Sequence, residues 1–322
     1  MKINKFIKEL DRSHKVYLIS HINPDGDSIG SLLGLGLGLI ERYNNKIVMV
    51  KSDNIPSKFK FLAGINLLKT TDFIHKKYEN SILITLDCGD LKRIGKLYDD
   101  VSDFNKIINI DHHKSNENYG DINYVYEKSS STCEVVYNIL KELKINITKE
   151  IATSLYLGIS TDTGSFKYDN TTSETHKIAS ELLDYNINQN MIIKNAYQNR
   201  SINKTRLFIE ALNKLQFYYD NNVGISCIDM ETIENLDVTS EHFDGIVEFI
   251  RDTEGIEVAC VLREIKHNTI KVSLRSKNDI DVSNIAKSFN GGGHRKAAGC
   301  TVEGNLIETK EKVLEQIKNS LR

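Results

Sequence analysis

The sequence predicts an α/β protein in which a parallel sheet with flanking helices is followed by a smaller α+β domain. In the first half, short apolar runs alternate with amphipathic segments, the pattern of strands and crossover helices. After a helical stretch, the pattern changes to strands of alternating hydrophobicity. A chain of 322 residues is long enough for two cores. We therefore predict a first domain at residues 1–187, a connector at 188–204 and a second domain at 205–322.

Four short apolar runs in the first domain predict strands that are buried in a parallel sheet. They are rich in β-branched residues and bounded by polar segments, as buried strands are. The runs are KVYLIS (15–20), KIVMV (46–50), SILITLD (81–87) and KIINID (106–111).

Helical patterns fill the intervals between and after these strands. Residues 28–42 predict a first helix whose Gly30, Gly34 and Gly38 share one face, which indicates close packing on the sheet. Their spacing does not fit a GxGxxG nucleotide loop. Further helices are predicted at 129–143, where Ser131 and Glu134 fit a capping box, at 148–166 as far as Gly158, and over most of 173–215.

The second domain is predicted to hold its own sheet. Its expected strands lie at 221–229, 256–265 and 269–276, and its helices near 239–251 and after 305. The segment GGGHRKAAG (291–299) suits anion binding, because three glycines let backbone amides approach and His294, Arg295 and Lys296 add positive charge. A helix beginning near Lys296 would add its dipole. A flexible loop is the alternative explanation for the glycines alone.

Composition excludes several classes of function. The formal net charge of −2 provides no positive field for a long nucleic acid, so a nucleic-acid substrate would have to be short. The N-terminus lacks the apolar run of a signal peptide, and no segment reaches the roughly 20 apolar residues of a membrane span. Five widely spaced cysteines without a CxxC pair indicate reduced thiols. We expect a cytoplasmic protein without membrane contact.

Acidic and imidazole side chains lie at the end of three of the four predicted strands or just after it. Because the carboxyl ends of parallel strands meet at one edge, these groups should converge. Asp162 should join them, since it lies where a helix gives way to a turn. The other residues are His21, Asp25 and Asp27 after the first strand, Asp87 and Asp90 after the third, and Asp111, His112 and His113 after the fourth.

Converging carboxylates repel one another unless cations neutralise them. Oxygen ligands mixed with imidazole favour Mn²⁺ or Mg²⁺, with Zn²⁺, Fe²⁺ and Co²⁺ left open. Each motif alone also has a structural explanation: NPDGD is typical of a turn, and an Asp at a strand end often caps a helix. The combination favours a metal site.

In this order, the motifs HINPDGDSIGS, LDCGD, DHH and STDTGSF resemble those of the DHH phosphoesterases. The segment SLRSKNDIDVSNIAKSFNGGGHRKAAG (273–299) resembles the DHHA1 substrate-binding module. Within that family, the chain is most similar to the branch of nanoRNases that are also pAp phosphatases. The resemblance implies a DHH domain, a smaller DHHA1 domain and an active site in the cleft between them.

The resemblance also implies roles for individual residues. His21 and Asp25 would hold one metal ion, while Asp27, His112 and Asp162 would hold a second, with Asp87 bridging both. His113 would face the substrate phosphate, and Asp111 would orient the two imidazoles. Asp90 would orient a water or ligand, or would cap the following helix together with Arg93. The implied substrate contacts in the second domain are Arg275, Gly291, Gly292, Gly293, His294 and Arg295.

The implied activity is hydrolysis of phosphoesters with two Mn²⁺ ions, for which Mg²⁺ or Co²⁺ could substitute. Two such ions can activate a shared water for attack on phosphorus. Short single-stranded RNA would yield mononucleotides, and pAp would yield AMP. A homodimer is compatible with this activity. The main alternative is a phosphodiesterase for cyclic dinucleotides or linear products such as pApA and pGpG. A pyrophosphatase is disfavoured by the GGGH module, and a non-catalytic nucleotide-binding protein is disfavoured because no ligand is missing.

Overall fold

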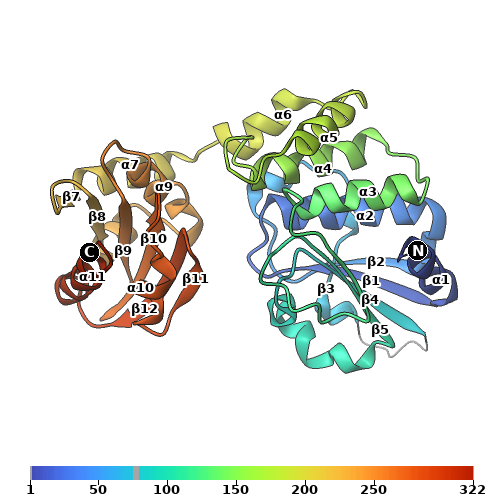
Figure 1. Ribbon diagram of the computed structural model, residues 1–322, viewed down its shortest axis with the longest axis horizontal. Helices are drawn as coiled ribbons and strands as arrows, with labels where there is room; N and C mark the ends of the chain where they lie inside the picture. The colour runs from blue at the N-terminus through green and yellow to red at the C-terminus, as the bar shows by residue number, and fades with distance from the viewer. Residues whose placement is uncertain (1, 75–79, 322) are drawn as a thin grey trace. The chain divides into compact units, whose positions relative to one another are not determined.

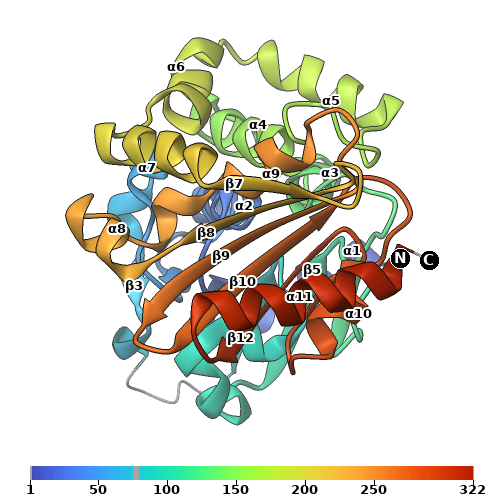
Figure 2. The same cartoon turned by 90° about the vertical axis from the view of Figure 1, so that its left-hand side faces the viewer.

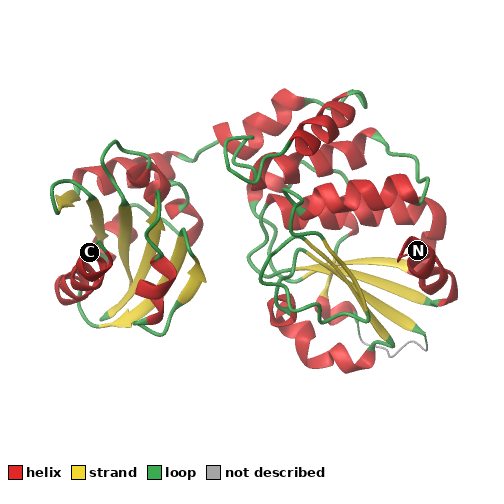
Figure 3. Cartoon of the chain, viewed as in Figure 1, coloured by secondary structure: helices red, strands yellow, loops and turns green. Residues whose placement is uncertain are grey.

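A computed structural model describes residues 2–74 and 80–321 (Figure 1). The chain forms two compact units, Met1–Asn199 and Arg200–Arg322, each with its own sheet and helices (Figure 3). The predicted connector contains α6 (Gln189–Ile193), a π-helical turn at Lys194–Gln198 and the start of α7 (Ile202–Asn213). In the described part of the chain, no helix has both the length and the apolar character that crossing a bilayer requires.

The sheet of the first unit has the strand order β3-β2-β1-β4-β5-β6, and all its pairings are parallel. The four predicted strands are confirmed to within one residue at each end, whereas β3 and β6 were not predicted. Both lie at sheet edges and are too short to show an apolar pattern. The strands are β1 (Lys15–Ser20), β2 (Ile47–Lys51), β3 (Lys69–Thr70), β4 (Ser81–Leu86), β5 (Lys106–Asp111) and β6 (Ile122–Val125).

Helices cover this sheet and form the main core with it. α2, α3 and α4 contribute Leu32, Val136 and Leu155 to one cluster with the strand residues Leu18 and Ile84. A separate cluster joins other strand side chains to the 3₁₀ segment Leu91–Asp103. The helices of the unit include α1 (Lys2–Arg12), α2 (Gly26–Tyr43), α3 (Thr132–Glu142), α4 (Lys149–Asp162) and α5 (Ser173–Leu183).

The glycine face of α2 packs closely, as predicted, but against helices rather than the sheet. A Cβ on Gly30 would lie 2.5 Å from the Ser154 carbonyl oxygen, and one on Gly34 would lie 2.5 Å from Leu155. Both partners belong to α4. The prediction of the sheet as partner was wrong because α2 is sandwiched between the strands and a further helix.

The helix α4 also runs past Gly158, where the sequence had suggested its end, and stops at Asp162. Gly158 is explained by close packing, since a Cβ there would lie 2.2 Å from Cys133 Sγ and 3.0 Å from Asp27 Oδ1. The placement of Asp162 at the junction of helix and turn is confirmed.

The second unit contains a mixed sheet with the order β11-β12-β10-β9-β8-β7. Its three predicted strands are confirmed as β8, β9 and β10. α10 and α11 pack on one face of the sheet, with α11 lying across the strands in Figure 2, while α7 and α9 pack on the other. The strands are β7 (Leu215–Tyr218), β8 (Val223–Ile228), β9 (Val258–Lys266), β10 (Thr269–Ser276), β11 (Gly292–His294) and β12 (Ala297–Glu303), and the helices after α7 are α8 (Met230–Asn235), α9 (Ile246–Arg251), α10 (Val282–Lys287) and α11 (Leu306–Ser320).

The helix predicted near Lys296 is absent from this described segment, and that prediction was wrong. Lys296 lies in the turn between β11 and β12. β12 pairs with β10 over seven residues, from Ala297 opposite Arg275 to Glu303 opposite Thr269. This pairing satisfies the backbone groups of the AAG segment within the sheet, so a helix is not formed there.

Candidate metal centre

The ends of β1, β4 and β5, which are neighbours in the first sheet, bring the predicted ligands together. In three groups, each residue has a ligand atom within 4.8 Å of those of the other members. Asp87 belongs to two groups and the remaining predicted ligands to at least one. The groups are His21, Asp25 and Asp87; Asp27, His112 and Asp162; and Asp87, His112 and His113.

The Asp87 carboxylate lies between two sets of donors. Its Oδ2 is 3.4 Å from His21 Nε2, whereas its Oδ1 is 3.8 Å from His112 Nε2. His21 Nε2 also lies 3.6 Å from Asp25 Oδ2, and His112 Nε2 lies 3.4 Å from Asp162 Oδ2. The two oxygens of Asp87 therefore face different imidazoles, an arrangement suited to bridging two cations.

The loop after β1 places Asp25 and Asp27 on either side of the start of α2. Asp25 is the N-cap, and its Oδ1 accepts a hydrogen bond from the Ser28 backbone N–H at 2.9 Å. Asp27 lies in the first turn of the helix and is buried. The NPDGD segment thus bends at Asn23 and begins α2 at Gly26 instead of forming a separate turn, and it brings both carboxylates to the cluster.

The three imidazoles are oriented by different partners. His21 Nδ1 lies 2.8 Å from the Ile22 carbonyl and His112 Nδ1 lies 3.2 Å from the Ser129 carbonyl, so Nε2 of each ring faces the carboxylates. His113 Nδ1 instead lies 2.7 Å from Asp111 Oδ1. Asp111 therefore supports His113, while His112 has its own support, contrary to the expectation that Asp111 orients both.

The balance of burial and neighbouring carboxylates raises the pKa values of several groups in the cluster. Burial alone would lower the pKa of His21, but hydrogen bonds with Asp25 and Asp87 raise it to about 10. Burial and the charge of Asp87 raise the pKa of Asp162 to about 8. Burial, with Asp87 and Asp162 nearby, raises the pKa of Asp27 well above its usual range. A divalent cation would relieve this repulsion and displace the protons, so the donor set fits a metal site.

The sequence did not reveal that the N-terminus of α3 holds two of these carboxylates. The backbone N–H groups of Thr132 and Cys133 donate to Asp27 Oδ2 and Oδ1 at 2.7 and 2.9 Å. The Thr132 hydroxyl donates to Asp87 Oδ1 at 3.0 Å. The capping box was recognised only as a helix start, although the free N–H groups of a helix N-terminus are suited to carboxylates.

Of the two hydrogen bonds of the predicted capping box, the structure shows the one to Ser131 Oγ, whereas the Glu134 side chain has other partners. Ser131 Oγ accepts from the Glu134 backbone N–H at 3.1 Å, as expected. The Glu134 carboxylate, however, accepts from the backbone N–H and the hydroxyl of Ser130 and from the Thr175 hydroxyl. Glu134 thus ties the start of α3 to α5 rather than returning to Ser131.

Two further polar side chains support the centre in ways that the sequence did not predict. Asn170 Nδ2 donates to the Ser130 and Asp162 carbonyls at 2.9 and 3.1 Å, which connects the turn after α4 with the segment before α3. Arg93 Nη2 lies 3.2 Å from His21 Nδ1, and the Arg93 carbonyl accepts from the Ile22 N–H. Neither could be assigned from spacing, because both act on partners distant in the sequence.

Asp90 lies outside the three groups of candidate ligands. Its Oδ1 accepts from the Lys92 backbone N–H at 2.9 Å and so caps the 3₁₀ segment that follows. This geometry corresponds to the second of the two roles considered for Asp90, although the Arg93 side chain turns to His21 instead of sharing the cap.

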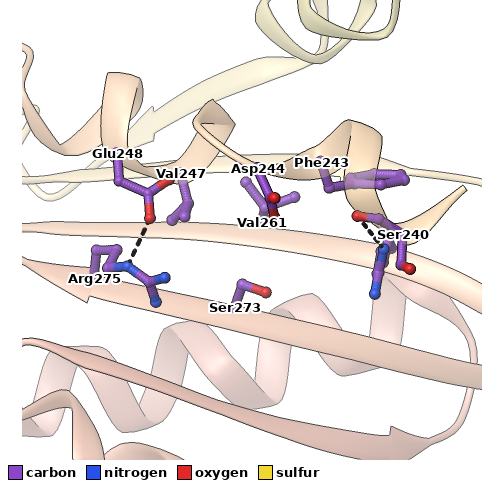
Figure 4. A pocket seen from close by; sticks show the side chains of 9 residues that line it. Ser240, Phe243, Asp244, Val247, Glu248, Val261, Ser273 and Arg275 are labelled. Atoms are coloured by element: carbon purple, nitrogen blue, oxygen red, sulfur yellow. Dashed lines mark hydrogen bonds and ion pairs between the residues drawn. The ribbon is translucent and has the colours of Figure 1, made fainter. Parts of the chain in front are cut away.

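In the second unit, the two predicted arginines lie at different places. Arg275 lines a pocket under α9 and pairs with Glu248 (Figure 4), with Nε 2.9 Å from Oε1. Arg295 lines another pocket, and its Nη2 donates to the Asp279 carbonyl at 2.8 Å. Gly292 and His294 lie on β11, opposite Gly299 and Ala297 of β12.

Comparisons with known proteins agree with this architecture. Residues 15–159 match the DHH family, N-terminal domain, and residues 221–322 match the DHHA1 domain. The chain is 32% identical to the bifunctional oligoribonuclease and PAP phosphatase NrnA of Thermus thermophilus, over 95% of this chain and 90% of that protein. It is 28% identical to the protein of that name from Bacillus subtilis, over 92% of each. The crystal structure of an exopolyphosphatase-related protein from Bacteroides fragilis superposes with a TM-score of 0.92 at 29% identity, covering 99% of this chain and 96% of that one.

Proposed function

Because the chain belongs to the DHH phosphoesterase family and carries its DHHA1 domain, we propose that it hydrolyses short oligoribonucleotides to mononucleotides and converts pAp to AMP. The relatives named as oligoribonuclease and PAP phosphatase cover nearly the whole chain, which supports this substrate class. The single observation that carries the proposal is the position of Asp87, whose two oxygens face the imidazoles of two different ligand groups.

We assign the ligands accordingly. His21 and Asp25 would hold one ion, Asp27, His112 and Asp162 a second, and Asp87 both. Mixed carboxylate and imidazole donors favour Mn²⁺, with Mg²⁺ or Co²⁺ as substitutes. Such ions supply Lewis acidity and lower the pKa of a coordinated water.

His113 is suited to contact the substrate phosphate. Burial alone would lower its pKa, but the hydrogen bond to Asp111 and the charge of Asp87 raise it to about 9. When protonated, the imidazole can donate from Nε2 to a phosphoryl oxygen while Asp111 holds its Nδ1. Asn116 Nδ2 donates to Asp111 Oδ2 at 2.5 Å and keeps that carboxylate in place.

The second unit would bind the remainder of the substrate. Gly292 leaves open space where a side chain would stand, and His294 and Arg275 contribute polar groups on the same sheet. We propose contacts from Arg275, Gly291, Gly292, Gly293, His294 and Arg295, and a short nucleotide as substrate rather than a long nucleic acid.

The test is a parallel hydrolysis assay with Mn²⁺ and four labelled substrates: a diribonucleotide, pAp, a cyclic dinucleotide and pyrophosphate. We expect turnover of the first two, and its loss when a chelator removes the metal. Rapid cleavage of pyrophosphate alone would contradict the proposal, and a preference for the cyclic dinucleotide would favour the alternative phosphodiesterase.

A matched variant tests the role of the bridging carboxylate. Asp87→Asn keeps the size of the side chain but removes its charge, and it should abolish hydrolysis and weaken Mn²⁺ binding. Asp90→Asn, which changes a carboxylate outside the ligand groups, should retain metal binding. Full activity in Asp87→Asn would rule out the two-metal arrangement.

A further inference from the structure

A pocket in the second unit lies between the sheet and the segment that runs from the 3₁₀ turn Ser240–Phe243 into α9 (Figure 4). Its floor comes from β9 and β10, with Val261, Arg263, Ser273 and Arg275, and its wall includes Phe243 and Glu248. Of these residues, the sequence had pointed to Arg275 alone. The other polar groups raise the question of which ligand the pocket fits.

At one end of the pocket, Arg263 belongs to the lining, and Lys271 on the neighbouring strand lies on the same face of the sheet. Arg263 of β9 is directly opposite Lys271 of β10 in the antiparallel register. Like charges in this position destabilise a sheet. Within the described residues, no carboxylate lies within 4 Å of either cation, although Asp244 in the pocket wall offsets part of the charge on Arg263. The pair is therefore suited to an anionic ligand.

The Arg263 guanidinium is also held in place. It lies over the Phe243 ring, 4.7 Å from the ring centroid, and its Nη1 is 3.4 Å from the Ser240 carbonyl. Stacking on an aromatic ring and a carbonyl contact fix the plane of the guanidinium without neutralising it. A guanidinium fixed in this way can bind phosphate oxygens with little loss of conformational entropy.

At the other end, an acceptor lacks a donor. Glu248 Oε1 accepts from Arg275 Nε at 2.9 Å. Glu248 Oε2 is buried and has no hydrogen-bond partner among the described residues. Buried polar atoms are nearly always paired, so this oxygen is available to a donor from a ligand. A sugar hydroxyl or a base amino group would supply one.

The two ends are separated by a distance that suits a nucleotide. Arg263 and Ala259, the residue opposite Arg275, are four positions apart on β9, or about 13 Å of strand. Between them, a row of small residues crosses the sheet. Ser273 of β10 lies opposite Gly299 of β12, and Gly299 lies opposite Gly292 of β11. A Cβ on Gly292 would meet nothing within 4 Å, so the glycine is not needed for internal packing. A ligand longer than free phosphate can lie across this row.

We propose that this pocket is a nucleotide subsite in which Arg263 and Lys271 bind a terminal 5′-phosphate that is not cleaved, while Glu248 accepts a hydrogen bond from the sugar or base. The inference rests on the proposed function and deepens it. It makes Arg263 and Lys271 determinants of specificity, which select substrates with a 5′-phosphate over otherwise identical ones without it.

The test compares pApA with ApA, which differ only in the 5′-phosphate, in the full-length chain with Mn²⁺. The kcat/KM of the wild type should be roughly 10- to 100-fold higher for pApA than for ApA, because one or two charge-assisted contacts to the 5′-phosphate contribute about that much. The double variant R263Q/K271Q should bring that ratio close to one and leave ApA hydrolysis within about threefold. Lys318→Gln removes a charge from α11, which packs on the other face of the sheet, and should keep the preference.

Binding of 5′-AMP and adenosine, titrated by calorimetry, separates this inference from the proposed function. If the wild type hydrolyses neither dinucleotide, the proposed function fails, and weaker 5′-AMP binding in the double variant with unchanged adenosine binding would still support the subsite. A pApA preference that survives the double substitution, or 5′-AMP binding that it leaves unchanged, would overturn the inference. If the double variant loses kcat/KM equally for both dinucleotides and has a lowered Tm, Arg263 and Lys271 have a structural role, and the inference is overturned.

Discussion

Replacing Thr132 by Val should weaken metal binding without disturbing the fold of the first unit. The side chain is fully buried, and Val is similar to Thr in size but lacks the hydroxyl. The substitution removes the hydroxyl that donates to Asp87 Oδ1 at 3.0 Å, whereas the backbone N–H of residue 132 can still donate to Asp27. One hydrogen bond is therefore deleted from the carboxylate that faces both ligand groups.

The size of the expected loss in Mn²⁺ affinity follows from the negative charge of the acceptor, the Asp87 carboxylate. Hydrogen bonds to charged groups contribute about 1.5–3 kcal/mol, and partners of metal ligands typically change affinity by about 10- to 100-fold. We expect a loss in Mn²⁺ affinity within this range. Thr132→Ser keeps the hydroxyl and should recover affinity to within a few-fold.

The assay is calorimetric titration of the metal-free protein with Mn²⁺, with circular dichroism as a check of the fold. Thr309→Val is a matched control, because Thr309 is fully buried in the second unit and its hydroxyl has no partner among the described residues. Wild-type affinity in Thr132→Val would refute the reasoning. Equal losses in Thr132→Val and Thr132→Ser would also refute it, because packing rather than the hydrogen bond would then be responsible.

Two further predictions concern pH and packing. His21 and His113 have pKa values raised to about 10 and about 9, above the unfolded value near 6.5, so their stabilising effect is complete below pH 6.5 and is lost as pH rises toward 10. The Tm of the metal-free protein should fall over this window while Mn²⁺ affinity rises; a constant Tm would contradict the assignment. Gly158→Ala should lower the free energy of unfolding of the first unit by about 1–3 kcal/mol in urea, because its Cβ would overlap Cys133. The control Gly292→Ala should change stability little, because a Cβ there meets nothing within 4 Å. Similar effects of the two substitutions would argue against close packing as the role of Gly158.

The parts of the fold that were predictable are those in which burial dictates residue type. The strands that became β1, β4 and β5 are continuous β-branched runs because helices or loops cover both their faces. β11 and β12 escaped prediction because Gly292–His294 and Ala297–Glu303 carry small or polar residues without a clear apolar alternation. Their strand conformation comes from pairing with β10, a tertiary effect that local sequence does not encode.

The site shows the same division between local and tertiary information. His21, Asp87 and His112 could be grouped because parallel topology brings the ends of their strands together, whatever the lengths of the intervening segments. Thr132 and Asn170 act through hydrogen bonds to residues elsewhere in the chain, and nothing in their own surroundings distinguishes them from ordinary helix-start or turn residues. Ligands that follow strands are therefore predictable, whereas their supports require the structure.

The adjacent residues His112 and His113 show how those supports divide chemistry between identical side chains. His112 Nδ1 lies against a neutral carbonyl, that of Ser129, which fixes the ring and leaves the Nε2 lone pair for a cation among Asp27, Asp87 and Asp162. His113 Nδ1 lies against the buried Asp111 carboxylate, which favours the protonated ring. With Nδ1 held by Asp111, the His113 ring has Nε2 left to contact a phosphate oxygen. These different supports are in line with the roles that we propose for the two rings, a metal ligand for His112 and a phosphate contact for His113.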